Sequence, residues 1–115
     1  MESTLTEAIV QGMQAKKALD ISILHLKGIN NAIADYFIVC SGHATSQVAA
    51  IADSIIEATY KQTGEYPWKQ EGLTTKEWIL LDYANVVAHV FQHEKRAIYR
   101  LDTLWGDVAT TRIAS

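Results

Sequence analysis

The segment from Trp78 to Gln92 constrains the fold more than any other part of the sequence. Two runs rich in β-branched and aromatic residues flank Ala84-Asn85, a turn-forming pair, and this pattern predicts a tight β-hairpin. If Tyr83 and Val86 close the turn, three pairs face each other: Asp82 with Val87, Leu80 with His89, and Trp78 with Phe91. Side chains alternate between the two faces of a strand, so one face of the hairpin is almost wholly apolar and the other is mixed.

The two faces of the hairpin predict different uses. The apolar face, suited to packing under helices, consists of Ile79, Leu81, Tyr83, Val86, Ala88 and Val90. The mixed face, suited to contact with a partner, consists of Trp78, Leu80, Asp82, Val87, His89 and Phe91. Trp78 is the best interface candidate among the tryptophans because it shares a face with Asp82 and His89, and tryptophan is enriched in binding hot spots, whereas Trp68 is expected in the core. His89 is either a hydrogen-bonded structural imidazole or part of the contact surface.

Hydrophobic periodicity predicts the remaining elements. Helices are expected at about residues 5–17, from a cap at Thr45 or Ser46 to about residue 63, and at 94–100; strands are expected at 20–26, 35–42 and 68–71. Side chains in strand 20–26 alternate in a way that suits one solvent-exposed face. Strand 35–42 is apolar on both faces and belongs at the centre of the sheet. Gly64 stands where helices commonly end.

The order of these elements predicts a single α/β domain with a mixed β-sheet. The helices are expected mainly on one face, which leaves the other face at least partly open. The domain is expected to span residues 1–107, and residues 108–115 are expected to form a flexible C-terminal tail.

Composition narrows the class of protein. A chain of 115 residues has room for one domain and can bury a core without disulfides or metal. Its net charge of −3 and pI of about 5.7 argue against nonspecific binding to a phosphate backbone, and we expect no direct sequence-specific nucleic-acid binding. Cys40 is the only cysteine, no apolar run approaches a membrane span, and the acidic N-terminus is unlike a signal peptide, so we expect a cytoplasmic protein without a membrane partner.

The sequence offers weak signals for a metal or a nucleophile. His89 and His93 have metal-ligand spacing for a helix, but in a strand they would lie about 13 Å apart, too far to share one zinc ion. Cys40 with His43 could form a nucleophilic pair, but a cysteine that follows four apolar strand residues is more often a small buried hydrophobe. We therefore expect no metal site and no catalytic residue.

Two further chemistries also lack their signatures. The turn at residues 41–46 could hold an anion at a helix start, but neither common glycine-rich phosphate motif is present. Asp82 could serve a nucleotidyl transfer only with a second carboxylate, usually in an Asp-x-Asp pair, and the chain has no such pair. We expect no cofactor, and Asp82 on this view is a carboxylate that accepts hydrogen bonds beside a turn.

The chain resembles the ribosomal silencing factor family, also called Iojap-like. The similarity spans most of the chain in family order, and its segments are Lys17-Ala18-Leu19-Asp20-Ile21, Ala34-Asp35-Tyr36-Phe37-Ile38-Val39-Cys40-Ser41-Gly42, Ser46-Gln47-Val48, Ile51-Ala52-Asp53, Gln70-Glu71-Gly72, Glu77-Trp78-Ile79-Leu80-Leu81-Asp82-Tyr83, Val86-Val87-Ala88-His89-Val90-Phe91, Arg96-Ala97-Ile98-Tyr99-Arg100-Leu101 and Leu104-Trp105-Gly106-Asp107. One departure is Ala84-Asn85, where the family pattern has Gly-Asp.

The resemblance implies an α/β domain similar in topology to nucleotidyltransferases but without their catalytic acids. It implies a translation repressor that binds the large ribosomal subunit through ribosomal protein L14 and blocks joining of the small subunit when nutrients are short. It also implies large-subunit assembly as an alternative role and a homodimer in some members. A residual nucleotidyltransferase-like enzyme and a purely structural dimer remain as alternatives from other classes.

The candidate site follows from combining this resemblance with the hairpin faces. An acidic domain with aromatic and carboxylate side chains on one sheet face suits a basic ribosomal protein. We expect Trp78, Asp82 and His89 to contact that partner. Their expected neighbours in the contact are Glu71, Tyr36, Tyr83 and Tyr99.

Overall fold

A computed structural model describes residues 4–29, 32, 34–101 and 108–113 of the chain. Within these residues the elements are, in order, α1 (Thr4–Ala15), β1 (Leu19–His25), β2 (Tyr36–Gly42), α2 (Thr45–Thr63), β3 (Lys69–Glu71), β4 (Trp78–Asp82), β5 (Val86–Gln92), α3 (His93–Tyr99) and β6 (Thr110–Arg112). The strands form one six-stranded sheet in the order β3-β4-β5-β2-β1-β6. Of the described strands, β2 and β5 pair in parallel and the other neighbours pair antiparallel, so the sheet is mixed, as the sequence predicts.

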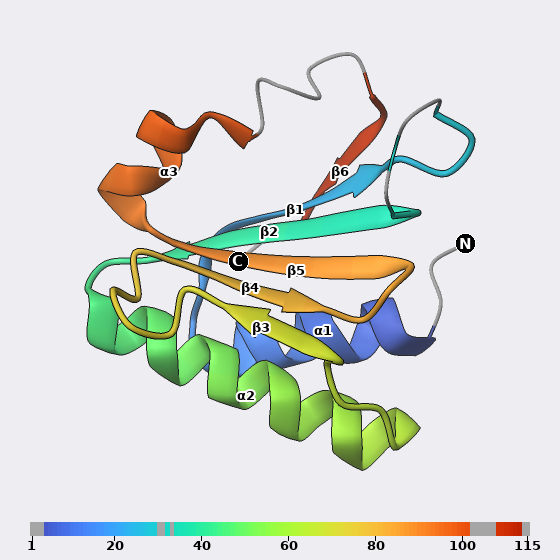
Figure 1. Cartoon of the computed structure of the whole chain (residues 1–115), viewed down its shortest axis with the longest axis horizontal. Coiled ribbons are helices and arrows are strands. Elements are labelled where there is room, and N and C mark those ends of the chain that lie inside the picture. Colours follow the sequence, from blue (N-terminus) through green and yellow to red (C-terminus); the bar gives the residue numbers. More distant parts are fainter. Residues whose placement is uncertain (1–3, 30–31, 33, 102–107, 114–115) are drawn as a thin grey trace.

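The helices occupy both faces of the sheet but unequally. Helices α1 and α2 lie side by side under one face, and the short helix α3 lies on the other (Figure 1). The main core fills the space between the sheet and the α1–α2 layer, with Ile9, Met13, Ile38, Ile51, Ile55 and Val90 among its fully buried side chains. A second core cluster lies on the α3 side, and it includes Leu24, Phe37, Val39, Val87, Phe91 and Leu101. The face expected to be at least partly open is therefore covered in part by α3.

The hairpin of β4 and β5 has the register that alternation predicts. Trp78 pairs with Phe91, Leu80 with His89 and Asp82 with Val87. The amide of Tyr83 donates to the carbonyl of Val86 at 2.9 Å and closes the turn. Ala84 takes a φ of 78°, a left-handed conformation that alanine rarely adopts, so the turn needs support from its surroundings.

Three local predictions are wrong. Strand β1 has no solvent-exposed face in its middle, because Ser22 and Leu24 are both buried and Leu24 belongs to the α3-side cluster. Helix α2 is capped by neither Thr45 nor Ser46: its N-cap is Ala44, which makes no side-chain cap hydrogen bond. Residues 110–112 of the expected flexible tail form strand β6, which pairs with β1 from Ser22 to Leu24. The predicted C-terminal stop of α2 is correct, since the amide of Gly64 at φ 74° donates to the carbonyl of Tyr60.

Candidate partner-binding surface

Trp78 is held by aromatic side chains from two elements. Its ring stacks on Phe91 of the neighbouring strand with 4.8 Å between ring centroids, and the ring of Tyr99 from α3 also lies 4.8 Å away. The indole Nε1 donates a hydrogen bond to Nδ1 of His89 at 3.0 Å. Trp78 is half-buried and Tyr99 is 41 % exposed, so this aromatic group is fixed from below and still reaches solvent.

The structure resolves the role of His89 in favour of the structural interpretation. The side chain is buried on the α3 face, with its ring 4.6 Å from that of Phe37 in an edge-on arrangement. Because Nδ1 accepts the Trp78 hydrogen bond, the neutral ring carries its proton on Nε2. His89 therefore orients Trp78 from beneath and is not itself a surface residue.

Asp82 lies at the other end of β4 and supports the strained turn. Its Oδ1 accepts a hydrogen bond from the amide of Ala84 at 2.8 Å, as expected for a carboxylate beside a turn. The same oxygen accepts from Nε1 of Trp68 at 3.2 Å. Trp68 is 69 % exposed, so its prediction as a core residue is wrong. Asp82 thus connects the hairpin turn to Trp68, a surface tryptophan that the sequence did not indicate as part of the site.

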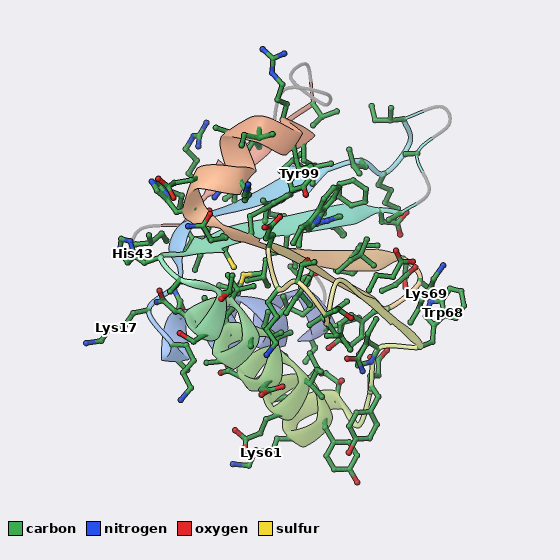
Figure 2. All side chains as sticks on the ribbon, turned by 60° about the vertical axis from the view of Figure 1, so that its left-hand side comes forward. Lys17, His43, Lys61, Trp68, Lys69 and Tyr99 are labelled. Atoms are coloured by element: carbon green, nitrogen blue, oxygen red, sulfur yellow. The ribbon has the colours of Figure 1, made fainter. Side chains whose placement is uncertain are left out.

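Strand β3 adds a pair of charges to the same face. Lys69 pairs with Asp82 and Glu71 with Leu80, and directly opposite residues share a face of the sheet. The Nζ of Lys69 and Oε2 of Glu71 form an exposed ion pair at 3.0 Å. Trp68 and Lys69 lie next to each other at one side of the molecule (Figure 2). We define the β3–β4 surface as Trp68, Lys69, Glu71, Trp78, Leu80, Asp82 and Tyr99.

Two predicted site residues face the other way. The hydroxyl oxygen of Tyr83 lies 2.9 Å from Oγ1 of Thr59 on α2, and the Tyr83 side chain is buried in the main core. Burial raises the pKa of Tyr83, and the Thr59 hydrogen bond opposes this in part. Tyr36 packs against the same core and meets the ring of His25 edge-on at 5.5 Å. Both tyrosines therefore lie on the α1–α2 side, so the structure does not bring them together with Trp78 and Asp82.

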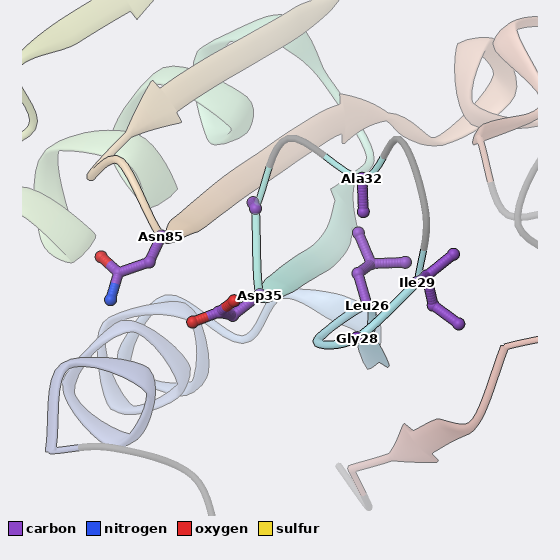
Figure 3. A pocket seen from close by; sticks show the side chains of 7 residues that line it. Leu26, Gly28, Ile29, Ala32, Asp35 and Asn85 are labelled. Atoms are coloured by element: carbon purple, nitrogen blue, oxygen red, sulfur yellow. The ribbon is translucent and has the colours of Figure 1, made fainter.

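A small hollow lies beside the hairpin turn, where the connector after β1 meets the start of β2. Figure 3 shows the side chains of Leu26, Ile29 and Ala32 on one side of it and the polar ends of Asp35 and Asn85 on the other. Its volume is about 160 Å³, below the range of about 300–1,000 Å³ in which small-molecule sites usually fall. Within the residues that the structure describes, no group of three or more His, Cys, Asp or Glu side chains could hold a metal ion.

Cys40 is a buried hydrophobe, as predicted. Its side chain is fully buried in the main core, and burial raises the pKa of the thiol far above its ordinary range, which the nearby Arg96 guanidinium only partly opposes. A nucleophilic thiol needs exposure and a lowered pKa, so Cys40 does not have that role.

The raised pKa of Cys40 predicts a loss of stability in alkaline solution. The folded state holds this proton more tightly than the unfolded chain, so its contribution is complete below the ordinary thiol pKa of about 8.5 and declines above it. We expect the free energy of unfolding to fall by about 2 kcal/mol between pH 8 and pH 10, measured by urea denaturation. Cys40→Ala should remove most of this slope, and an equal slope in the variant would contradict the assignment.

The fold and the surface together define a class of protein. A single α/β domain with anchored aromatics beside carboxylates on one sheet face has the kind of surface that protein-binding modules use. None of the described helices is long and apolar enough to cross a membrane.

Comparison with known proteins identifies the family within this class. A family model described as "Ribosomal silencing factor during starvation" matches residues 2–115, and the chain belongs to this family. The ribosomal silencing factor of Halalkalibacterium halodurans is 38 % identical over 109 residues, covering 95 % of this chain and 92 % of the relative. That of Bacillus subtilis is 41 % identical over 92 residues, covering 80 % and 76 %.

Solved structures agree with the family match. A crystal structure from Chromobacterium violaceum superposes with a TM-score of 0.83 at 25 % identity, covering all of this chain and 95 % of the other. A crystal structure from Bacillus halodurans gives a TM-score of 0.77 at 32 % identity, covering 96 % and 97 %. The chain is accordingly a ribosome-binding translation regulator and not an enzyme.

Proposed function

We propose that this protein binds the large ribosomal subunit by seating its β3–β4 surface on ribosomal protein L14, and that it thereby blocks joining of the small subunit. The observation that carries the choice of surface is the pairing of anchored, solvent-reaching aromatics with carboxylates on one face. Trp78 and Trp68 lie at opposite ends of β4, next to Tyr99 and Asp82 respectively. This arrangement suits a partner whose surface combines apolar side chains with positive charge.

The way Trp78 is held makes it a suitable anchor. Stacking on Phe91 and the hydrogen bond to His89 fix the indole before any partner arrives. Little side-chain entropy then remains to be lost on binding, and pre-organised aromatic residues are the usual centres of binding energy. His89 acts here as a positioning residue for Trp78.

Blocking of subunit joining requires occupancy and no chemistry. Two bodies cannot occupy the same face of the large subunit, so a bound domain of this size excludes the small subunit by steric overlap. The strength of repression then follows from affinity and concentration. We propose that the nucleotidyltransferase-like topology implied by the family resemblance serves here only as a scaffold, and that the protein acts in the cytoplasm, where its ribosomal target lies.

We propose that a homodimer would form through the β3–β4 surface, so that dimerisation and ribosome binding would compete for it. The β3–β4 surface is the described face with exposed aromatic rings close to an edge strand, and pairing of two copies there would hide Trp68. A self-association measured by light scattering should therefore weaken when purified L14 is added.

Alanine at Trp78 or Trp68 should weaken binding to large subunits by about 30-fold or more, since truncation of a hot-spot residue costs about 2 kcal/mol or more. The measurement is co-sedimentation over a range of protein concentrations. Tyr66→Ala is the matched control, because Tyr66 is an exposed aromatic (60 %) that stacks on Tyr60 of α2, outside the surface. A folded Trp78→Ala variant that binds as tightly as wild type would show that the surface has been misplaced.

A further inference from the structure

Helix α3 is held on the sheet without a buried side chain of its own. It spans His93–Tyr99, and none of these residues is buried; the chain is buried again at Leu101. A helix of two turns is marginal in water by itself, so its position depends on the groups that attach it. It lies on the face of the sheet opposite α1 and α2 (Figure 1). Two of its side chains, Arg96 and Tyr99, make these attachments.

Arg96 attaches α3 to strands β1 and β2. Its Nη1 donates to the carbonyl oxygen of Asp20 at 2.7 Å and to Oγ of Ser41 at 3.0 Å. Ser41 is fully buried and Arg96 is half-buried, so the guanidinium points into the fold. Hydrogen bonds from a charged donor are stronger than those between neutral groups. These two bonds therefore fix one side of the helix.

An irregularity in β1 supplies one of the two acceptors. The pairing of β1 with β2 shifts in register between Leu19 and Ser22, and Asp20 takes a φ of 50°, in the left-handed region. A residue other than glycine keeps such a conformation when its surroundings hold it there. The irregular strand gives Arg96 an acceptor, and the hydrogen bond from Arg96 in turn supports the conformation of Asp20.

Tyr99 attaches α3 to strands β4 and β5. Its ring centroid lies 4.8 Å from that of Trp78 and 6.0 Å from that of Phe91. In the sheet order, β5 and β2 separate β4 from β1, so Arg96 and Tyr99 hold the helix at two distinct points. Residues three apart are neighbours on a helix surface, and a rotation of α3 that moves Arg96 therefore also moves Tyr99.

We propose that Arg96 is a positioning residue for ribosome binding. By fixing α3 on the sheet it holds Tyr99 against Trp78, in the arrangement that the β3–β4 surface presents to its partner. Arg96 does not belong to that surface and acts through Tyr99. An aromatic pair that is already in place loses less conformational freedom on binding, which is how a residue behind the contact raises affinity. This inference rests on the proposed function.

The first test removes the guanidinium and keeps most of its aliphatic stem. Arg96→Met should weaken binding to isolated large subunits and to purified L14 by about 10-fold, within the range of coupling measured between neighbouring residues. The near-ultraviolet circular dichroism of the aromatic rings should change at the same time, while urea denaturation shows that the variant is folded under the binding conditions. Arg96→Lys keeps the charge on a chain one bond shorter, and it should fall between the wild type and Arg96→Met.

The matched control is Lys95→Met, which removes one positive charge from the same helix outside the β3–β4 surface. It should bind within about twofold of the wild type, because isolated changes away from a contact have small effects. An equal loss of affinity in Lys95→Met and Arg96→Met would mean that the charge of α3, and not the position of Tyr99, determines binding. That result would overturn the inference.

A double-mutant cycle separates positioning from direct contact. If Arg96 acts through Tyr99, adding Arg96→Met to Tyr99→Ala should cost at most about a further twofold in affinity, because the side chain to be positioned is already absent. A further loss as large as that of Arg96→Met alone would show that Arg96 acts independently of Tyr99. A folded Arg96→Met variant with wild-type affinity would equally overturn the inference.

The proposed function fails by different results. If the wild-type protein binds neither large subunits nor L14, or if Trp78→Ala binds as tightly as wild type, the β3–β4 surface is not the contact. If Trp78→Ala and Tyr99→Ala both weaken binding while Arg96→Met does not, the surface stands and the role of Arg96 is refuted.

Discussion

Gly72→Ala is expected to destabilise the protein by about 3 kcal/mol or more. Gly72 has a φ of 83°, which costs an L-residue about 1–2 kcal/mol. A Cβ at this position would also overlap the carbonyl group of Trp78, with 2.9 Å to its carbon and 3.2 Å to Cα of Ile79. These are backbone atoms of β4, so no side-chain rotation can make room. The connection from β3 to β4 must therefore rearrange, and Trp78 must move with it.

The controls for Gly72 are two glycines with the same conformation but open surroundings. Gly64 (φ 74°) and Gly28 (φ 86°) have no atom within 4 Å of an added Cβ. Alanine at either should cost only the conformational term, about 1 kcal/mol or slightly more. Urea denaturation of all three variants isolates the overlap as the difference between them. A Gly72→Ala variant no less stable than Gly64→Ala would contradict the packing of this loop against Trp78.

Gly12→Ala is expected to cost about 2 kcal/mol, although alanine normally favours a helix over glycine by about 1 kcal/mol. Gly12 lies where α1 crosses α2, and an added Cβ would approach Cα of Ile55 to 2.7 Å and the carbonyl oxygen of Ser54 to 3.0 Å. The helices would have to separate, which would loosen the packing around Ile55 and strain the hydrogen bond from Oγ of Ser54 to the carbonyl of Gly12 (2.8 Å).

An exposed position on the same helix provides the comparison for Gly12. Gln14→Ala changes a solvent-facing residue of α1 and should alter the free energy of unfolding by no more than about 0.5 kcal/mol. Thermal and urea denaturation of the two variants measure the effect. Stabilisation by Gly12→Ala would mean that helix propensity outweighs the close crossing, contrary to the geometry described above.

The sequence predicted the hairpin register because alternation leaves little freedom there. A shift of one residue would bring Trp78 and Asp82 into the main core and expel Ile79 and Leu81, so the apolar pattern alone selects the pairing. The sequence of strand β6 has no apolar alternation of this kind. Thr110, Thr111 and Arg112 are polar and exposed, and they form a strand only because β1 offers them a free edge. Pairing of that kind depends on tertiary position.

The candidate site was predictable in part for the same reason. The positions of Trp78 and Asp82 follow from the hairpin faces, and Tyr83 could have been excluded by the same alternation, since it belongs to the apolar face. Tyr36 could not, because its strand is apolar on both faces and gives no alternation to follow. Trp68 was missed because its role depends on a hydrogen bond to Asp82, fourteen residues away.

Sedimentation of the purified protein with isolated large subunits, isolated small subunits and joined ribosomes tests the central claim most directly. The protein should comigrate with large subunits and not with small ones. Adding it before the two subunits are mixed should lower the amount of joined ribosomes in proportion to its occupancy, and Trp78→Ala should lose both effects together. Absence from the large-subunit fraction at moderate salt, or binding that leaves subunit joining unchanged, would contradict the account.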